Sequence, residues 1–184
     1  KLLNTFPDIA IYGKTIANGI PMGAIVGKKK IMDYALKTFI SSVFWTEKLG
    51  PACALTFIKK HKKHNISRKL IATGKEIKKI WINAAKENNL EINISGIDPL
   101  ASFQLKTKSW PATLTYFIQE MLKRNILATD KCYTNFKHSK NDIRLYKNAC
   151  NEIFAEIYKH DKKGNILNKL KGPIKQMGFN RLTN

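Results

Sequence analysis

Apolar and polar residues alternate along this chain with two different periods, one typical of helices and one typical of strands. Residues 67–88 predict a long amphipathic helix, because their apolar side chains recur at three- and four-residue steps. The residues of this stripe are Leu70, Ile77, Ile80, Trp81 and Ala84. The stretch is therefore expected to bury one face against the rest of its domain.

Shorter patterns predict the remaining elements. Further helices are expected at 29–36, 51–63, 112–123 and 143–158, the second with Pro51 as its first residue. Ser139 and Asp142 fit a capping box before the last of these helices, and His138 is expected to fix the entry to it. Alternating or continuous apolar runs predict strands at 9–12, 91–94, 100–105, 126–128 and 133–136. Sheet and covering helices together indicate an α+β domain towards the C-terminus.

Lys14 is the leading candidate for chemistry. The run 9–12 has the length and β-branched content of a buried strand, and Gly13, Gly19 and Gly23 then break the regular pattern. Lys14 is thus predicted at a partly desolvated strand end, where a lysine loses some of its preference for the charged form. A free amine can attack a carbonyl group and form a Schiff base, and nearby glycines let a flat cofactor approach the backbone.

The segment around Lys14 resembles the lysine segment of the class III aminotransferases, which are fold-type I enzymes of pyridoxal 5'-phosphate (PLP). The matching residues are Pro7-Asp8-Ile9, Gly13-Lys14, Asn18-Gly19, Pro21 and Gly23-Ala24-Ile25-Val26-Gly27. Residues 39–55 are similar to the segment that closes over the cofactor phosphate in that family. The resemblance continues through 96–103, 119–128 and 172–182, and it is strongest to the branch of glutamate-1-semialdehyde aminomutase.

This resemblance implies an α/β fold of fold-type I, represented by its C-terminal part. Residues 1–65 would be the end of the PLP-binding large domain, 66–90 a linking helix, and 91–184 a small α+β domain. A complete family member is more than twice as long. Its preceding half carries the phosphate-cradling loop, the aromatic residue that stacks on the pyridine ring and the aspartate that pairs with the ring nitrogen.

The resemblance also implies a reaction and its residues. Lys14 would be both catalytic and cofactor-binding, transferring an amino group from an amino donor to a carbonyl acceptor through its Schiff base with PLP. The enzyme would be a homodimer, and the loop with Ser42 and Val43 would bind the phosphate in the neighbouring subunit. The family usually has threonine where Val43 stands, so one hydroxyl donor is missing and cofactor binding is expected to be weaker.

The net charge suggests a different class of protein. The chain has 33 Lys+Arg against 13 Asp+Glu, a formal charge of +20, which ordinarily indicates nucleic acid or an anionic surface. Only four of these cations are arginines, the side chain preferred for specific readout of bases and phosphate. The excess of Lys, Ile and Asn suggests AT-rich codons instead. A basic nucleic-acid-associated protein, or an inactive fragment of an aminotransferase, remain the alternatives, and no specific nucleic acid is expected.

Other sequence features bear on the cellular location and on metal binding. No apolar run reaches the roughly 20 residues of a membrane-spanning helix, and the N-terminus has no signal-peptide plan, so a cytoplasmic protein without membrane partners is expected. Cys53, Cys132 and Cys150 are widely spaced and predict reduced packing residues. His61 and His64 have a spacing that could share a metal, but the lysines around them oppose a cation, so no metal site is expected.

Overall fold

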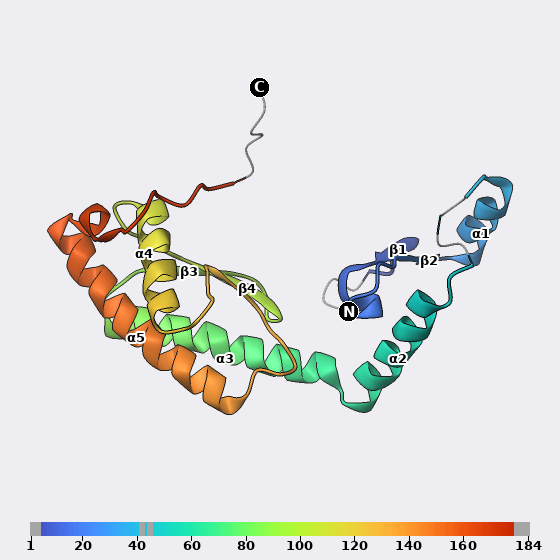
Figure 1. Cartoon of the computed structure of the whole chain (residues 1–184), viewed down its shortest axis with the longest axis horizontal. Coiled ribbons are helices and arrows are strands. Elements are labelled where there is room, and N and C mark those ends of the chain that lie inside the picture. Colours follow the sequence, from blue (N-terminus) through green and yellow to red (C-terminus); the bar gives the residue numbers. More distant parts are fainter. Residues whose placement is uncertain (1–4, 41–42, 44–45, 179–184) are drawn as a thin grey trace, which may run out of the picture. The chain divides into compact units, whose positions relative to one another are not determined.

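The chain forms two compact units, Lys1–Ile66 and Ser67–Asn184 (Figure 1). The computed structural model describes residues 5–40, 43 and 46–178. Sheets and helices occur in both units, which agrees with the expected α/β class. The domain boundaries predicted from the sequence, with a linking helix at 66–90, stay a prediction.

The first unit contains a two-stranded antiparallel sheet around the lysine turn. Strand β1 (Ile9–Tyr12) pairs with β2 (Ala24–Gly27), so that Ile9 lies opposite Gly27 and Tyr12 opposite Ala24. The short 3-10 helix η1 (Lys14–Ala17) follows β1 after one residue. The strand predicted at 9–12 is therefore confirmed.

Strand β1 is exposed, which corrects the expectation of a buried strand. Ile11 is 77% exposed and Tyr12 53% exposed. The physical reason is that, among the described residues, β1 and β2 pair with each other alone, in a sheet of two strands. An apolar composition predicts that other residues will cover a strand, but it does not say that those residues belong to the same unit.

Two helical segments complete the first unit. Helix α1 (Lys29–Met32) and the 3-10 helix η2 (Asp33–Lys37) occupy the predicted helix 29–36. Helix α2 (Leu49–Lys63) starts two residues earlier than predicted, so Pro51 is its third residue. The first turn tolerates proline at each of these positions because its N–H groups lack intrahelical acceptors. Glu47 Oε1 accepts a hydrogen bond from the Leu49 N–H at 2.9 Å and stabilises this start.

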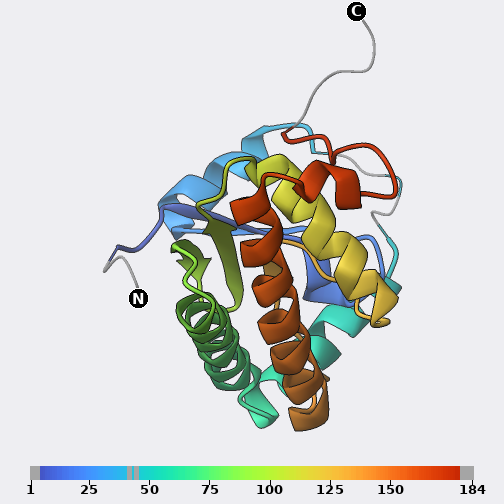
Figure 2. The same ribbon diagram turned by 90° about the vertical axis from the view of Figure 1, so that its left-hand side faces the viewer.

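The second unit is a three-stranded antiparallel sheet with helices packed on it. Helix α3 (Ile66–Glu87) confirms the long amphipathic prediction, with Ile77, Ile80, Trp81 and Ala84 buried. Strands β3 (Ile92–Ile97), β4 (Leu100–Leu105) and β5 (Lys131–Tyr133) follow, with β4 in the centre. Helices α4 (Trp110–Lys123) and α5 (Lys140–Lys163) lie side by side beside this sheet (Figures 1 and 2).

Phe103 of β4 is the centre of the core of the second unit. Its ring centroid lies 4.9 Å from that of Trp81 on α3, 5.3 Å from Phe117 on α4 and 5.7 Å from Phe154 on α5. Ala101, Phe103 and Leu105 are buried at alternate positions of β4, so one face of this strand packs on the helices. Burial of these aromatic rings stabilises the unit.

Helix α3 meets the β3–β4 hairpin at a glycine. A Cβ atom on Gly74 would lie 1.8 Å from the carbonyl oxygen of Asp98, so any larger residue would overlap the hairpin backbone. One turn along the helix, Lys78 Nζ donates hydrogen bonds to the Gly96 carbonyl and to Asp98 Oδ1, each at 2.9 Å. The hairpin is thus fixed to α3 by close backbone contact and by a half-buried ion pair.

The capping residues predicted from the sequence occur at the start of α5. Ser139 Oγ accepts a hydrogen bond from the Asp142 N–H, and the Asp142 carboxylate accepts one from the Ser139 N–H. His138 Nδ1 accepts a hydrogen bond from the Asn135 N–H at 3.3 Å, within the turn that leads into the helix. The capping box and the structural role of His138 at the helix entry are therefore confirmed.

A charged network joins α4 to α5. Arg124 donates to Glu152 Oε2 at 3.1 Å and to Glu156 Oε1 at 3.3 Å. Burial of Glu120 opposes its ionisation, but hydrogen bonds from Lys123 and Gln119 and the nearby positive charges outweigh burial, and they lower the pKa of Glu120. The ionised form of Glu120 therefore stabilises the folded state.

Of the predicted strands, one is absent and another is displaced. Residues 126–128 are not a strand, because the Ile126 N–H donates a hydrogen bond to the Met121 carbonyl at 2.9 Å, at the end of α4. Strand β5 occupies Lys131–Tyr133 instead of 133–136, pairing Cys132 with Ala101. Tertiary pairing with β4 decided the register here, whereas the apolar run alone had suggested a later position.

The described helices include none that is both long enough and apolar enough to cross a membrane. The three cysteines are free thiols, with Cys150 buried and Cys53 and Cys132 half-buried. The burial of Cys150 agrees with its prediction as a packing residue.

Candidate functional site

Lys14 lies where the sequence places it, in the turn that follows β1. It is the first residue of η1, and its backbone is left-handed, with φ at 54°. This conformation costs an L-residue other than glycine about 1–2 kcal/mol. The side chain is exposed, which corrects the expectation of partial desolvation. Within residues 5–40, 43 and 46–178 no hydrogen bond or ion pair engages the Lys14 ammonium group, so the amine is accessible.

The turn after Lys14 is held by its own hydrogen bonds and by one buried contact. The Ile16 N–H donates to the Gly13 carbonyl at 3.2 Å, and the Asn18 N–H donates to the Thr15 carbonyl at 3.0 Å. Ala17, the last residue of η1, is 1% exposed. Helix α2 packs on η1, so Ala17 is covered by that helix.

The backbone beside Lys14 leaves space for a ligand. Apart from the chain neighbours of each glycine, no described residue has an atom within 4 Å of a Cβ placed on Gly13 or on Gly19. An accessible primary amine next to an uncrowded backbone fits a flat aldehyde, because the amine can bond the carbonyl carbon without displacing a side chain. The fit of this turn to PLP therefore depends on the Lys14 amine.

The second predicted segment is described in part. Ser42 lies outside the described residues. Val43 is 95% exposed and Phe39, at the start of the same segment, is 96% exposed. The role of Ser42 and Val43 in binding the cofactor phosphate stays a prediction.

Sequence reasoning missed the residues that fix the lysine turn. Ala17 and Ala54 are 1% and 4% exposed, where α2 meets η1. An alanine in a helix is a weak indication of a close contact with a turn, since alanine is also the best helix former and occurs in helices for that reason alone. Nothing in the sequence Gly13-Lys14-Thr15 indicates a left-handed lysine.

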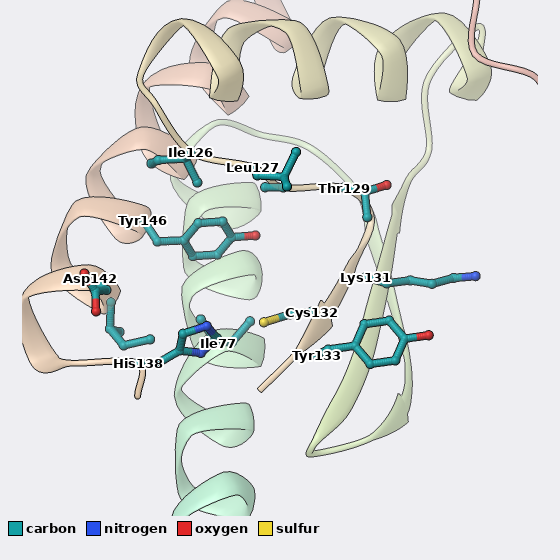
Figure 3. A pocket seen from close by; sticks show the side chains of 12 residues that line it. Ile77, Ile126, Leu127, Thr129, Lys131, Cys132, Tyr133, His138, Asp142 and Tyr146 are labelled. Carbon is teal, nitrogen blue, oxygen red and sulfur yellow. The ribbon is translucent and has the colours of Figure 1, made fainter. Parts of the chain in front are cut away.

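The second unit has an open pocket of about 420 Å³ beside β5 and the start of α5 (Figure 3). Ile77, Cys132 and His138 point into the same space, while the Lys131 side chain extends away from them (Figure 3). Because His138 Nδ1 accepts a hydrogen bond from the Asn135 N–H, the neutral ring carries its proton on Nε2. The pocket is lined mainly by apolar and aromatic side chains.

The thiols of this region are not activated. Burial raises the pKa of Cys132, and burial raises the pKa of Cys150 to about 12. A thiol of raised pKa is a poor nucleophile at neutral pH, so neither cysteine indicates covalent chemistry. The described residues contain no group of three or more side chains able to hold a metal ion.

The fold of the chain is that of PLP-dependent transaminases. The PLP internal aldimine form of the FumI protein of Sphingopyxis sp. MTA144 matches 86% of this chain with a TM-score of 0.77 and 20% identity. An omega-transaminase from Sphaerobacter thermophilus matches 86% with a TM-score of 0.74 and 16% identity. The chain covers 39% and 40% of these two proteins.

The chain is also similar in sequence to curated proteins of known family. A 3-aminobutyryl-CoA aminotransferase of Cloacimonas acidaminovorans (strain Evry) is 26% identical over an alignment of 165 positions that covers 86% of this chain. A glutamate-1-semialdehyde 2,1-aminomutase of Caldicellulosiruptor bescii is 24% identical over an alignment of 171 positions that covers 83% of the chain. No family model matches. The homologues are class III aminotransferases, which confirms the resemblance.

The chain spans about 40% of the length of these curated relatives. This agrees with the expectation that it corresponds to one part of a longer enzyme. The activity of the whole protein is therefore a matter for proposal.

Proposed function

We propose that this chain is part of a PLP-dependent aminotransferase or aminomutase in which Lys14 binds the cofactor covalently. The observation that carries the proposal is the similarity to class III aminotransferases along more than four fifths of the chain. Lys14 supports it locally, because it lies at the end of β1 with an accessible amine.

Lys14 has two roles in this proposal. Its Nζ would hold PLP covalently at the aldehyde carbon of the cofactor, with the aldehyde oxygen leaving as water. When an amino substrate takes its place, the freed amine would accept the proton that the substrate carbon loses and would donate a proton back. When bound, PLP supplies an electron sink for the carbon that loses its proton. The protein supplies the amine and the position in which it is held.

Ser42 and Val43 are proposed to bind the cofactor phosphate through their backbone N–H groups and the Ser42 hydroxyl. Val43 provides the shape of a threonine without its hydroxyl donor. The exposure of Phe39 and Val43 supports a role for this segment in contacts with a second copy of the protein. We therefore propose a homodimer whose sites are completed by this loop of the neighbouring subunit.

The substrates proposed are a small-molecule amino donor and a carbonyl acceptor. Transfer within one molecule, as the name of the aminomutase relative indicates, is the second possibility. A cytoplasmic location is proposed as well, supported by the three free thiols, because reduced cysteines are usual in reducing compartments. No specific nucleic-acid or membrane partner is part of the proposal.

Cofactor absorbance tests the proposal. The polypeptide encoded by the whole reading frame that contains this chain is incubated with PLP, freed of excess cofactor and examined in the visible range. The wild-type protein is expected to retain the absorbance of bound cofactor. Lys14→Arg is expected to lose it, because a guanidinium stays protonated and is a poor nucleophile. Lys30→Arg is the matched control, because Lys30 is also exposed in the first unit. If Lys14→Arg retains the same absorbance as the control, the proposal is wrong.

A further inference from the structure

In the described part of the first unit, the buried residues are all small. Its fully buried residues between 5 and 66 are Ala17, Gly50 and Ala54. Gly50 and Ala54 lie one turn apart on the same face of α2, and Ala17 ends the 3-10 helix that starts at Lys14. The buried residues of the described part of the unit therefore lie on η1 and on α2, the helix that packs on η1.

This contact lies beside a strained backbone. Lys14 is left-handed at φ 54°, and Asn18, just beyond η1, is left-handed at φ 48°. Strained conformations persist only where the surrounding structure determines them. The two hydrogen bonds of the turn join residues within it, and they cannot fix it relative to the rest of the unit. The packing of η1 on α2 supplies that constraint.

We infer that Ala17 and Ala54 are positioning residues for Lys14. Their small side chains let α2 approach η1 closely, which holds the turn in its strained conformation and so directs the Lys14 amine. The inference rests on the proposed function, since positioning matters for catalysis only if Lys14 binds PLP. Neither alanine contacts substrate or cofactor in this account.

A larger side chain at position 54 should disturb Lys14 before it disturbs the helix. Helix α2 has fifteen residues with intrahelical hydrogen bonds, whereas η1 has four residues and an unfavourable backbone angle at its start. Overpacking between two elements is relieved at the weaker one. The turn should therefore relax and change the environment of the Lys14 amine.

Ala54→Leu tests the inference in the polypeptide of the whole reading frame, loaded with PLP. Three quantities are measured: the affinity for PLP, the pH midpoint of the visible absorbance of the bound cofactor, and the fraction of Lys14 labelled after borohydride reduction. We expect affinity to fall by about tenfold and the midpoint to shift by about one pH unit. The midpoint reports the environment of the amine, which a general loss of stability would leave unchanged.

Matched variants separate positioning from a general effect of size. Ala52→Leu makes the same chemical change on the exposed face of α2 and should behave as wild type. Ala54→Ser keeps the small volume and should also retain the wild-type midpoint. Should Ala54→Leu fail to fold by far-UV circular dichroism, Ala17→Val imposes a smaller overlap on the other side of the same contact, and it should shift the midpoint in the same direction.

The outcomes distinguish the inference from the function on which it rests. A wild-type protein without label on Lys14 contradicts the proposed function. A labelled wild type together with an unchanged midpoint in folded Ala54→Leu or Ala17→Val overturns the inference alone. An equal shift in Ala52→Leu overturns it too, because the effect would then not depend on the buried contact.

Discussion

Substituting Gly74 by alanine tests the packing of the second unit most sharply. In an exposed helix interior this change stabilises a protein by about 0.5–1 kcal/mol, because alanine is the better helix former. In α3 the added Cβ would lie 1.8 Å from the Asp98 carbonyl oxygen and 2.4 Å from its carbonyl carbon. Both atoms belong to the backbone of the hairpin, so no side-chain rotation can relieve the overlap.

The magnitude follows from what must move. The hairpin or the helix has to shift by roughly 1.5 Å to restore van der Waals contact, and overpacking of this kind costs about 1–3 kcal/mol. The shift also stretches the two 2.9 Å hydrogen bonds that Lys78 donates to the hairpin. Hydrogen bonds to charged groups contribute about 1.5–3 kcal/mol each at most. After subtracting the helix-propensity gain, Gly74→Ala should lower the free energy of unfolding by about 2–4 kcal/mol.

Urea denaturation of the second unit measures this effect. Fluorescence of the fully buried Trp81 and far-UV circular dichroism should report one transition, with its midpoint lowered by about 1–2 M. Gly50→Ala is the matched control, because its Cβ would meet the flexible Met22 side chain at 3.4 Å and nothing closer. A Gly74→Ala protein as stable as wild type would refute the close backbone contact between α3 and the hairpin.

Three further predictions concern the cofactor loop, acid stability and the isolated chain. Val43→Thr should tighten PLP binding in the polypeptide of the whole reading frame by about 0.5–3 kcal/mol, measured by cofactor titration, and unchanged affinity would mean that the loop does not contact phosphate. Because the pKa of Glu120 is lowered in the folded state, its stabilisation is present above about pH 4.5 and is lost as the pH falls through the folded pKa. The free energies of unfolding of wild type and Glu120→Gln should therefore converge in acid, and parallel curves would contradict this. The 184-residue chain alone should bind polyanions in a salt-sensitive way and should not catalyse transamination with added PLP, so turnover in a rate assay would show that no further segment is needed.

Elements defined by local chemistry were predictable from the sequence. The capping box of Ser139 and Asp142 depends on residues three apart, and it occurs as predicted. The stripe with Ile77, Ile80 and Trp81 depends on one helical period, and those residues are buried. In both cases the information lies within a few turns of chain.

Features that depend on distant partners were not predictable. The β5 register depends on pairing with β4, and the absence of a strand at 126–128 depends on how α4 ends. The exposure of Ile11 follows from the number of strands that pair with β1, which its composition does not encode. For the candidate site, the position of Lys14 after a strand was predictable, but its left-handed backbone and the packing of Ala17 against α2 were not.

Residue-level mapping of the cofactor linkage tests the central claim most directly. The polypeptide of the whole reading frame is loaded with PLP, reduced with borohydride, digested and analysed by mass spectrometry. The account predicts one dominant modified lysine, Lys14, and no corresponding label in Lys14→Arg. A dominant label on another lysine, or no label above that of free surface lysines, would contradict the account.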